Sequence, residues 1–149
     1  MVPGSICQSP SSSVKVKKVF AVSMNHRTDK QTTVGELRQL MAQFVAERDW
    51  DKFHSPKNLA MALTIEAGEL MEHFQWLTTE QSKAIDDSVE HDVGEELSDV
   101  ICYAMSLANS LDIDVASAVF QKMEKNRLKY PADEFRGRYG EQDTSGTSD

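Results

Sequence analysis

The sequence has few of the residues that mark disulfide-rich, membrane-spanning or β-sheet proteins. Its 149 residues include 2 cysteines, 4 prolines and 7 glycines. Cys7 and Cys102 lie in a tail and in a predicted helix, which excludes a disulfide framework or a thiolate metal site and is typical of a reducing compartment. No apolar run approaches a membrane span, and no segment alternates with a period of two. We therefore predict an all-α, cytoplasmic protein that does not bind membranes.

Positive charge is also scarce. The chain has 16 Lys and Arg against 24 Asp and Glu, and its net charge is −8. A partner with a nucleic-acid backbone requires a basic surface, so this balance argues against a nucleic-acid polymer. A nucleotide is compatible with it, because a bound metal ion reverses the local sign of the charge.

Helical patterns occupy the centre of the chain, and we expect one domain over residues 33–131. Before it, residues 1–32 are expected to form a disordered extension, and residues 132–149 a polar tail. About 100 residues make a small helical core, so we expect a bundle of four to five helices completed by oligomerisation. Capping and periodicity signals place the main helices at residues 33–48, 55–76, 89–110 and 114–130.

Two pairs of acidic residues carry the main chemical signal. Glu66 and Glu69 are three residues apart, and so are Glu96 and Asp99 in the third helix. On a helix such residues share one face and repel each other unless a cation lies between them. Glu66 also falls within an apolar stripe, where an unpaired charge is costly. Four oxygen donors on two facing helices suit Mg²⁺, although two solvated acidic faces would give the same spacing.

Six short motifs follow one another along the chain: Arg48-Asp-Trp-Asp-Lys-Phe-His54, Ser55-Pro-Lys-Asn58, Glu66-Ala-Gly-Glu69, Phe74-Gln-Trp76, Glu95-Glu-Leu-Ser-Asp99 and Lys122-Met-Glu-Lys-Asn-Arg-Leu-Lys-Tyr-Pro131. In this order they resemble the MazG-like all-α nucleotide pyrophosphohydrolases, and among these the dCTP pyrophosphatase branch. The resemblance covers roughly residues 33–131.

The resemblance implies that a nucleoside triphosphate, most similar to dCTP, is hydrolysed to its monophosphate and pyrophosphate. It also implies a homotetramer with sites at subunit contacts. Glu66 or Glu69 would take a proton from the attacking water, and the sequence does not choose between them. The implied Mg²⁺ ligands are Glu66, Glu69, Glu96 and Asp99. The residues implied around the base and sugar are Trp50, His54, Trp76 and Tyr103, and those at the outer phosphates are Lys122, Asn126 and Arg127.

Three alternatives compete with this interpretation. Ferritin-like di-iron bundles need Glu-x-x-His on two helices, and no glutamate here has a histidine three residues later. A non-catalytic helical metal-binding or interaction module would explain the small domain without an enzyme. Individual aromatic residues such as Phe53 and Trp76 could also be plain core. Tyr103 is a stronger candidate for the site than these two residues, because it follows Asp99 by four residues on the same helix face.

Overall fold

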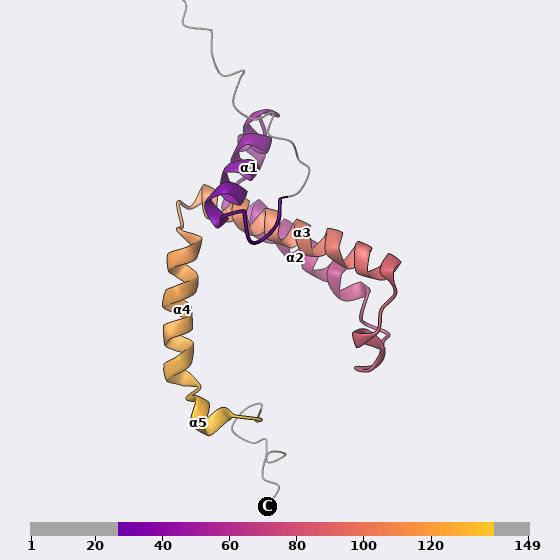
Figure 1. The fold of residues 1–149 in the computed structure, drawn as a ribbon. Coiled ribbons are helices and arrows are strands. Elements are labelled where there is room, and N and C mark those ends of the chain that lie inside the picture. The colour runs from indigo at the N-terminus through magenta and orange to yellow at the C-terminus, as the bar shows by residue number, and fades with distance from the viewer. Residues whose placement is uncertain (1–26, 139–149) are drawn as a thin grey trace, which may run out of the picture. The chain divides into compact units, whose positions relative to one another are not determined.

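The computed structural model describes residues 27–138, and in this range it confirms the all-α class. The terminal segments were expected at residues 1–32 and 132–149, and their parts 1–26 and 139–149 lie outside the described residues. Residues 28–32 form a turn, in which the carbonyl of Thr28 accepts from the amides of Gln31 and Thr32. The helices in the described part are α1 (Val34–Ala46), α2 (Pro56–Glu72), α3 (Asp87–Ser110), α4 (Val115–Lys129) and α5 (Ala132–Phe135), with short 3-10 helices η1 (Asp51–Phe53) and η2 (Gln81–Lys83) (Figure 1).

Polar side chains cap the starts of the four long helices in the described part of the chain. The sequence predicts these starts for α1, α2 and α4, whereas α3 begins at Asp87, two residues before the expected residue 89, because Asp86 caps it. Thr33 and Glu36 close a reciprocal capping box at the start of α1. Ser55 accepts from the amide of Asn58 and precedes a proline in the first turn of α2. Asp86 and Asp114 accept from backbone amides at the starts of α3 and α4. These starts therefore follow from local chemistry.

Two stretches differ from the expected helix ends. The sequence pattern extends the second helix to about Trp76, whereas α2 ends at Glu72. The amide of Phe74 donates to Met71 at 3.0 Å, and that of Leu77 to Phe74 at 3.0 Å, so the chain tightens into turns that span three residues. Residues 132–135, expected to belong to a polar tail, form the short helix α5.

The helices α2 and α3 pack along each other, and α1 packs against α3 (Figure 1). Helix α4 leaves the end of α3 and has no extensive contact with α2 in the described part of the chain. None of the described helices is both long and apolar enough to cross a membrane. The pair α2–α3 therefore forms the scaffold on which a site can be built.

Little apolar surface is buried in one chain. Among the described residues the buried core consists of Val45, Leu59 and Ala108. Large apolar side chains stay exposed, including Phe120 and Leu128 of α4 at 74% and 83%. A core of this size is small for a helical domain. The arrangement favours completion by another chain, which stays a prediction.

Candidate active site

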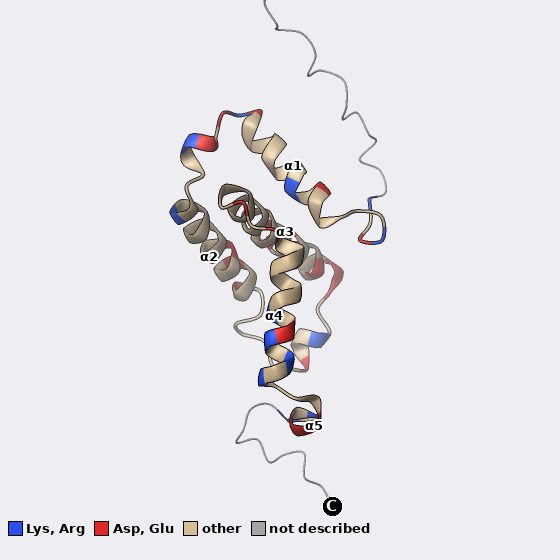
Figure 2. Ribbon diagram, turned by 90° about the vertical axis from the view of Figure 1, so that its left-hand side faces the viewer, with Lys and Arg blue, Asp and Glu red and all other residues tan. Residues whose placement is uncertain are grey.

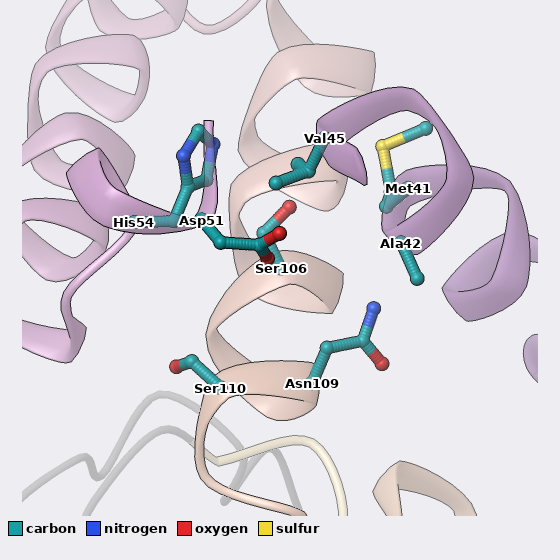
Figure 3. A pocket seen from close by; sticks show the side chains of 8 residues that line it. All are labelled: Met41, Ala42, Val45, Asp51, His54, Ser106, Asn109 and Ser110. Carbon is teal, nitrogen blue, oxygen red and sulfur yellow. The ribbon is translucent and has the colours of Figure 1, made fainter. Parts of the chain in front are cut away.

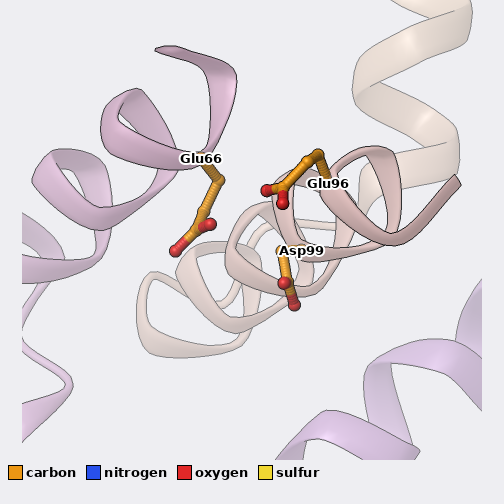
Figure 4. Close-up of side chains that lie close together, drawn as sticks. All are labelled: Glu66, Glu96 and Asp99. Atoms are coloured by element: carbon orange, nitrogen blue, oxygen red, sulfur yellow. The ribbon is translucent and has the colours of Figure 1, made fainter. Parts of the chain in front are cut away.

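Three carboxylates meet between α2 and α3. Glu66 projects from α2, and Glu96 and Asp99 project from α3 (Figure 4). One oxygen of each lies within 4.8 Å of the others. This cluster joins one member of the first acidic pair to both members of the second. Packing of the two helices thus supplies the facing arrangement that the sequence could only suggest.

The donor chemistry of the cluster fits a hard divalent cation. All three groups offer oxygen, and Mg²⁺ prefers oxygen ligands and is bound through a few carboxylates plus substrate phosphates. The Oε2 atom of Glu96 is buried and has no hydrogen-bond partner among the described residues. A buried carboxylate oxygen without a partner is costly, and a bound cation would remove that cost.

Burial and neighbouring negative charges together raise the pKa of one member of the cluster, Glu66. Partial burial is the largest cause that raises the pKa of Glu66, followed by the charges of Glu69, Asp99 and Glu96. Glu69 is therefore close enough to act on Glu66 electrostatically. Its carboxylate is exposed and does not belong to the group of three. Glu69 thus lies beside the acidic cluster that Glu66, Glu96 and Asp99 form.

A largely apolar pocket of about 560 Å³ lies beside the cluster, and we call it the aromatic pocket. Asp99 lines this pocket and also belongs to the acidic cluster. A ligand in the pocket would therefore lie next to the carboxylate of Asp99. The pocket is lined by Met41, Phe44, Val45, Trp50, Phe53, His54, Asn58, Leu59, Ala62, Asp99, Cys102, Tyr103 and Ser106.

Ring contacts fix one wall of the aromatic pocket. The rings of Trp50 and His54 are stacked, with centroids 6.3 Å apart, and Phe44 meets Trp50 edge-on at 5.9 Å. His54 Nδ1 lies 2.9 Å from the carbonyl oxygen of Trp50. The guanidinium of Arg48 covers the Phe44 ring at 3.6 Å. The segment around η1 thus presents aromatic surface whose orientation is set by its own contacts.

Tyr103 connects the pocket to the acids. Burial is the main cause that raises the pKa of its hydroxyl, and the charges of Glu66, Asp99 and Cys102 add to it. The phenol therefore stays protonated and can donate a hydrogen bond. Its position one turn after Asp99, inferred from sequence spacing, agrees with its place in the lining.

Other predicted site residues lie elsewhere in the single chain. Trp76 is 87% exposed in the turn after α2 and does not line the aromatic pocket. Lys122, Asn126 and Arg127 lie on α4, which leads away from the α2–α3 pair (Figure 1). Basic residues gather on the second half of α4 (Figure 2). One chain therefore assembles Trp50, His54 and Tyr103 beside the acids, but not these four residues.

Sequence reasoning misses several residues of the pocket. Periodicity places Met41 and Phe44 on the apolar face of the first helix, and it gives no role to Cys102 and Ser106. A signal for Ser106 is present, because it continues the face of Asp99 and Tyr103 at helical spacing. No pattern in the sequence indicates that residues of α1 line the pocket, since the packing of α1 on α3 depends on tertiary contacts.

Comparisons with known proteins identify the family of the chain. The MazG-like family profile matches residues 61–141. Over 119 residues the chain is 40% identical to dCTP pyrophosphatase 1 of Mus musculus, covering 78% of this chain and 70% of that protein. It is 44% identical over 104 residues to dCTP pyrophosphatase 1 of Homo sapiens, covering 68% and 61% respectively.

A solved structure adds a likeness in the fold. The crystal structure of a pyrophosphatase from Archaeoglobus fulgidus matches with a TM-score of 0.63 and 36% identity, over 72% of this chain and 98% of that one. The chain belongs to the MazG-like family. The family predicted from the sequence motifs is thereby confirmed.

Proposed function

We propose that this protein is a Mg²⁺-dependent nucleoside triphosphate pyrophosphohydrolase that acts on dCTP-like nucleotides in the cytoplasm. The observation that carries the proposal is the shared position of Asp99, which borders both the aromatic pocket and the acidic cluster. A nucleoside in the pocket would place its triphosphate at the carboxylates. The curated relatives and the solved structure are pyrophosphatases, which supports the class of reaction.

The metal ligands that we propose are Glu66, Glu96 and Asp99, with Glu69 beside them. When bound, Mg²⁺ neutralises phosphate charge and makes a water molecule more acidic. In this proposal the three clustered carboxylates hold the ion, and Glu69, which lies outside their group, acts as the general base. The sequence leaves this choice between Glu66 and Glu69 open, and the proposal favours Glu69.

The base-binding residues that we propose are Trp50, His54 and Tyr103. Stacked aromatic faces hold a planar nucleobase, and a protonated tyrosine donates to sugar or base oxygens. The preference for dCTP comes to this chain from the names of its relatives. The sequence spans 70% of the length of the mouse protein and 61% of the human protein, so the substrate of these relatives enters here as a proposal.

The remaining predicted residues suggest a site shared between subunits. We propose a homotetramer in which a second chain supplies Trp76 and the polar residues Lys122, Asn126 and Arg127. Support comes from the exposed apolar side chains of α4 and from the small core of one chain. Cations opposite the acidic cluster would neutralise the outer phosphates of the substrate.

The proposal is tested by measuring pyrophosphate release from dCTP, dUTP, dATP and their ribonucleotide counterparts with and without Mg²⁺. We expect hydrolysis only with the metal ion, with dCTP preferred. Glu69→Gln should abolish turnover, because the amide has lost the negative charge of the proposed base. The circular dichroism spectrum should stay unchanged, because the substitution keeps the shape of the side chain. Activity of this variant within about threefold of wild type would exclude Glu69 as the base.

A non-catalytic metal-binding or interaction module is the second candidate. The exposed apolar surface of α4 favours it, because a surface of this kind suits a protein partner. The same panel separates the two functions. A folded protein that binds Mg²⁺ but releases no pyrophosphate from any nucleotide would support the module.

A further inference from the structure

A pair of hydrogen bonds joins α1 to the last turn of α3. Arg38 Nε donates to Asn109 Oδ1 at 3.0 Å, and Asn109 Nδ2 donates to the carbonyl oxygen of Arg38 at 2.8 Å. The two residues are 71 positions apart, and both are half-buried. One bond engages the side chain of Arg38 and the other its backbone. Asn109 therefore fixes the position of the α1 backbone as well as that of a side chain.

Apart from this pair, helix α1 has little buried apolar contact within one chain. Val45 is the residue of α1 that is buried. Leu40 and Phe44 remain 52% and 43% exposed. Apolar contacts are non-directional, so a shallow contact of this kind leaves the helix free to shift along its neighbour. Two hydrogen bonds of opposite direction, by contrast, fix both the distance between α1 and α3 and their register along each other.

The Arg38–Asn109 pair lies near the aromatic pocket, next to a cavity that adjoins it. Asn109 lines an adjoining cavity of about 380 Å³, in which its amide turns toward the helix that carries Met41 and Ala42 (Figure 3). This cavity and the aromatic pocket share Met41, Val45, His54 and Ser106. Neither Arg38 nor Asn109 lines the aromatic pocket itself. Their effect on a bound nucleoside would therefore pass through the α1 residues that do.

We infer that Arg38 and Asn109 are positioning residues of the aromatic pocket. They hold α1 at the distance from α3 that a bound nucleobase requires. This inference rests on the proposed function. The acidic cluster stands on α2 and α3, which pack together without α1. Loss of the pair should thus loosen binding of the nucleoside and leave the metal site intact.

Kinetic constants of an Asn109→Ala variant test the inference. Assays at saturating Mg²⁺, well below the melting temperature, should give a KM for dCTP raised by about tenfold with kcat within about twofold of wild type. Preference for dCTP over dUTP should weaken, because α1 no longer fixes the wall of the pocket. Stabilisation by Mg²⁺, measured by melting without nucleotide, should equal that of wild type.

Two further variants sharpen the comparison. Asn109→Asp keeps the acceptor for Arg38 Nε and loses the donor to the carbonyl, so its KM should lie between those of wild type and Asn109→Ala. It carries the test if Asn109→Ala does not fold. The control is Gln43→Ala, which removes from the same helix a local bond to Glu47 of 2.8 Å on the exposed surface. Its KM should stay at the wild-type value.

The outcomes separate the inference from the proposed function. An active wild type whose KM is unchanged by Asn109→Ala, or raised equally by Gln43→Ala, overturns the inference alone. A loss confined to kcat has the same consequence, because it would place the effect at the acids. A wild type that hydrolyses no nucleotide overturns the proposed function and this inference with it.

Discussion

Replacing Glu66 by glutamine should have opposite effects on stability without and with Mg²⁺. Glu66 lies within 4.8 Å of Glu96 and Asp99. At that distance two like charges repel by about 1 kcal/mol in water and about 3.5 kcal/mol at an effective dielectric constant of 20. The cluster is open to solvent on the side of Asp99, so the lower figure applies. Glu66→Gln should then stabilise the metal-free protein by about 1–2 kcal/mol, or roughly 3–8 °C in melting temperature.

Mg²⁺ should reverse the order of the two proteins. A ligand present at 100 times its dissociation constant stabilises the folded state by about 2.7 kcal/mol. Wild type should gain about this much, whereas Glu66→Gln has lost one of the three carboxylates and should gain little. The melting curves of the two proteins would therefore cross as Mg²⁺ is added.

The assay is a thermal melt at pH 7 over a Mg²⁺ titration, with Glu95→Gln as the matched control. Glu95 lies on α3 next to the cluster but outside it, and it forms an exposed pair with His91 at 3.6 Å. Removing that pair should change stability by less than about 1 kcal/mol and preserve the response to Mg²⁺. A Glu66→Gln protein that is less stable without metal and still responds fully to Mg²⁺ would refute the cluster as an ion site.

Three other predictions follow from particular residues. Trp76→Ala should reduce kcat/KM for dCTP by a factor that corresponds to about 1–3 kcal/mol while helical content is kept, since Trp76 is 87% exposed in its own chain; unchanged kinetics would remove it from the site. Asp86→Asn should lessen the loss of stability in acid. Hydrogen bonds from Ser88 and Val89 lower the pKa of Asp86 below its ordinary value of 3.8, so its contribution to stability is present above that pH and is lost as the pH falls through the lowered pKa. Asparagine caps α3 without titrating, so its contribution does not change with pH. Melts of both proteins at pH 7 and pH 3 give the comparison, and equal losses would contradict it. Leu128→Asp should shift the protein to a smaller species in light scattering, because an 83% exposed leucine on α4 needs a partner surface; an unchanged mass would place the subunit contact elsewhere.

Local signals in the sequence indicated the four long helices and the starts of α1, α2 and α4. Each long helix follows a side chain that accepts from backbone amides two or three residues later, as Thr33, Ser55, Asp86 and Asp114 do, but the cap Asp86 was not foreseen and α3 was expected to begin at residue 89. Helix ends were less predictable. No glycine or proline marks the end of α2, and its last residues tighten into turns that the apolar period does not reveal.

The acidic pairs indicate the chemistry of the site from the sequence alone, because a spacing of three residues places both carboxylates on one helix face. Which of the four acids lie close together could not be read in this way. That choice depends on how α2 and α3 are rotated against each other, and their packing brings Glu66 to Glu96 and Asp99 and leaves Glu69 beside them.

The sequence by itself thus determined the all-α class and the family, and it predicted the residue types of the candidate site. Tertiary structure alone decided that α1 contributes Met41 and Phe44 to the aromatic pocket, and that Asn109 holds this helix from a position 71 residues away. The physical reason is the range of the interactions. Caps and face periodicity act within one or two helical turns, whereas the pocket is formed by contacts between helices that the intervening chain only connects.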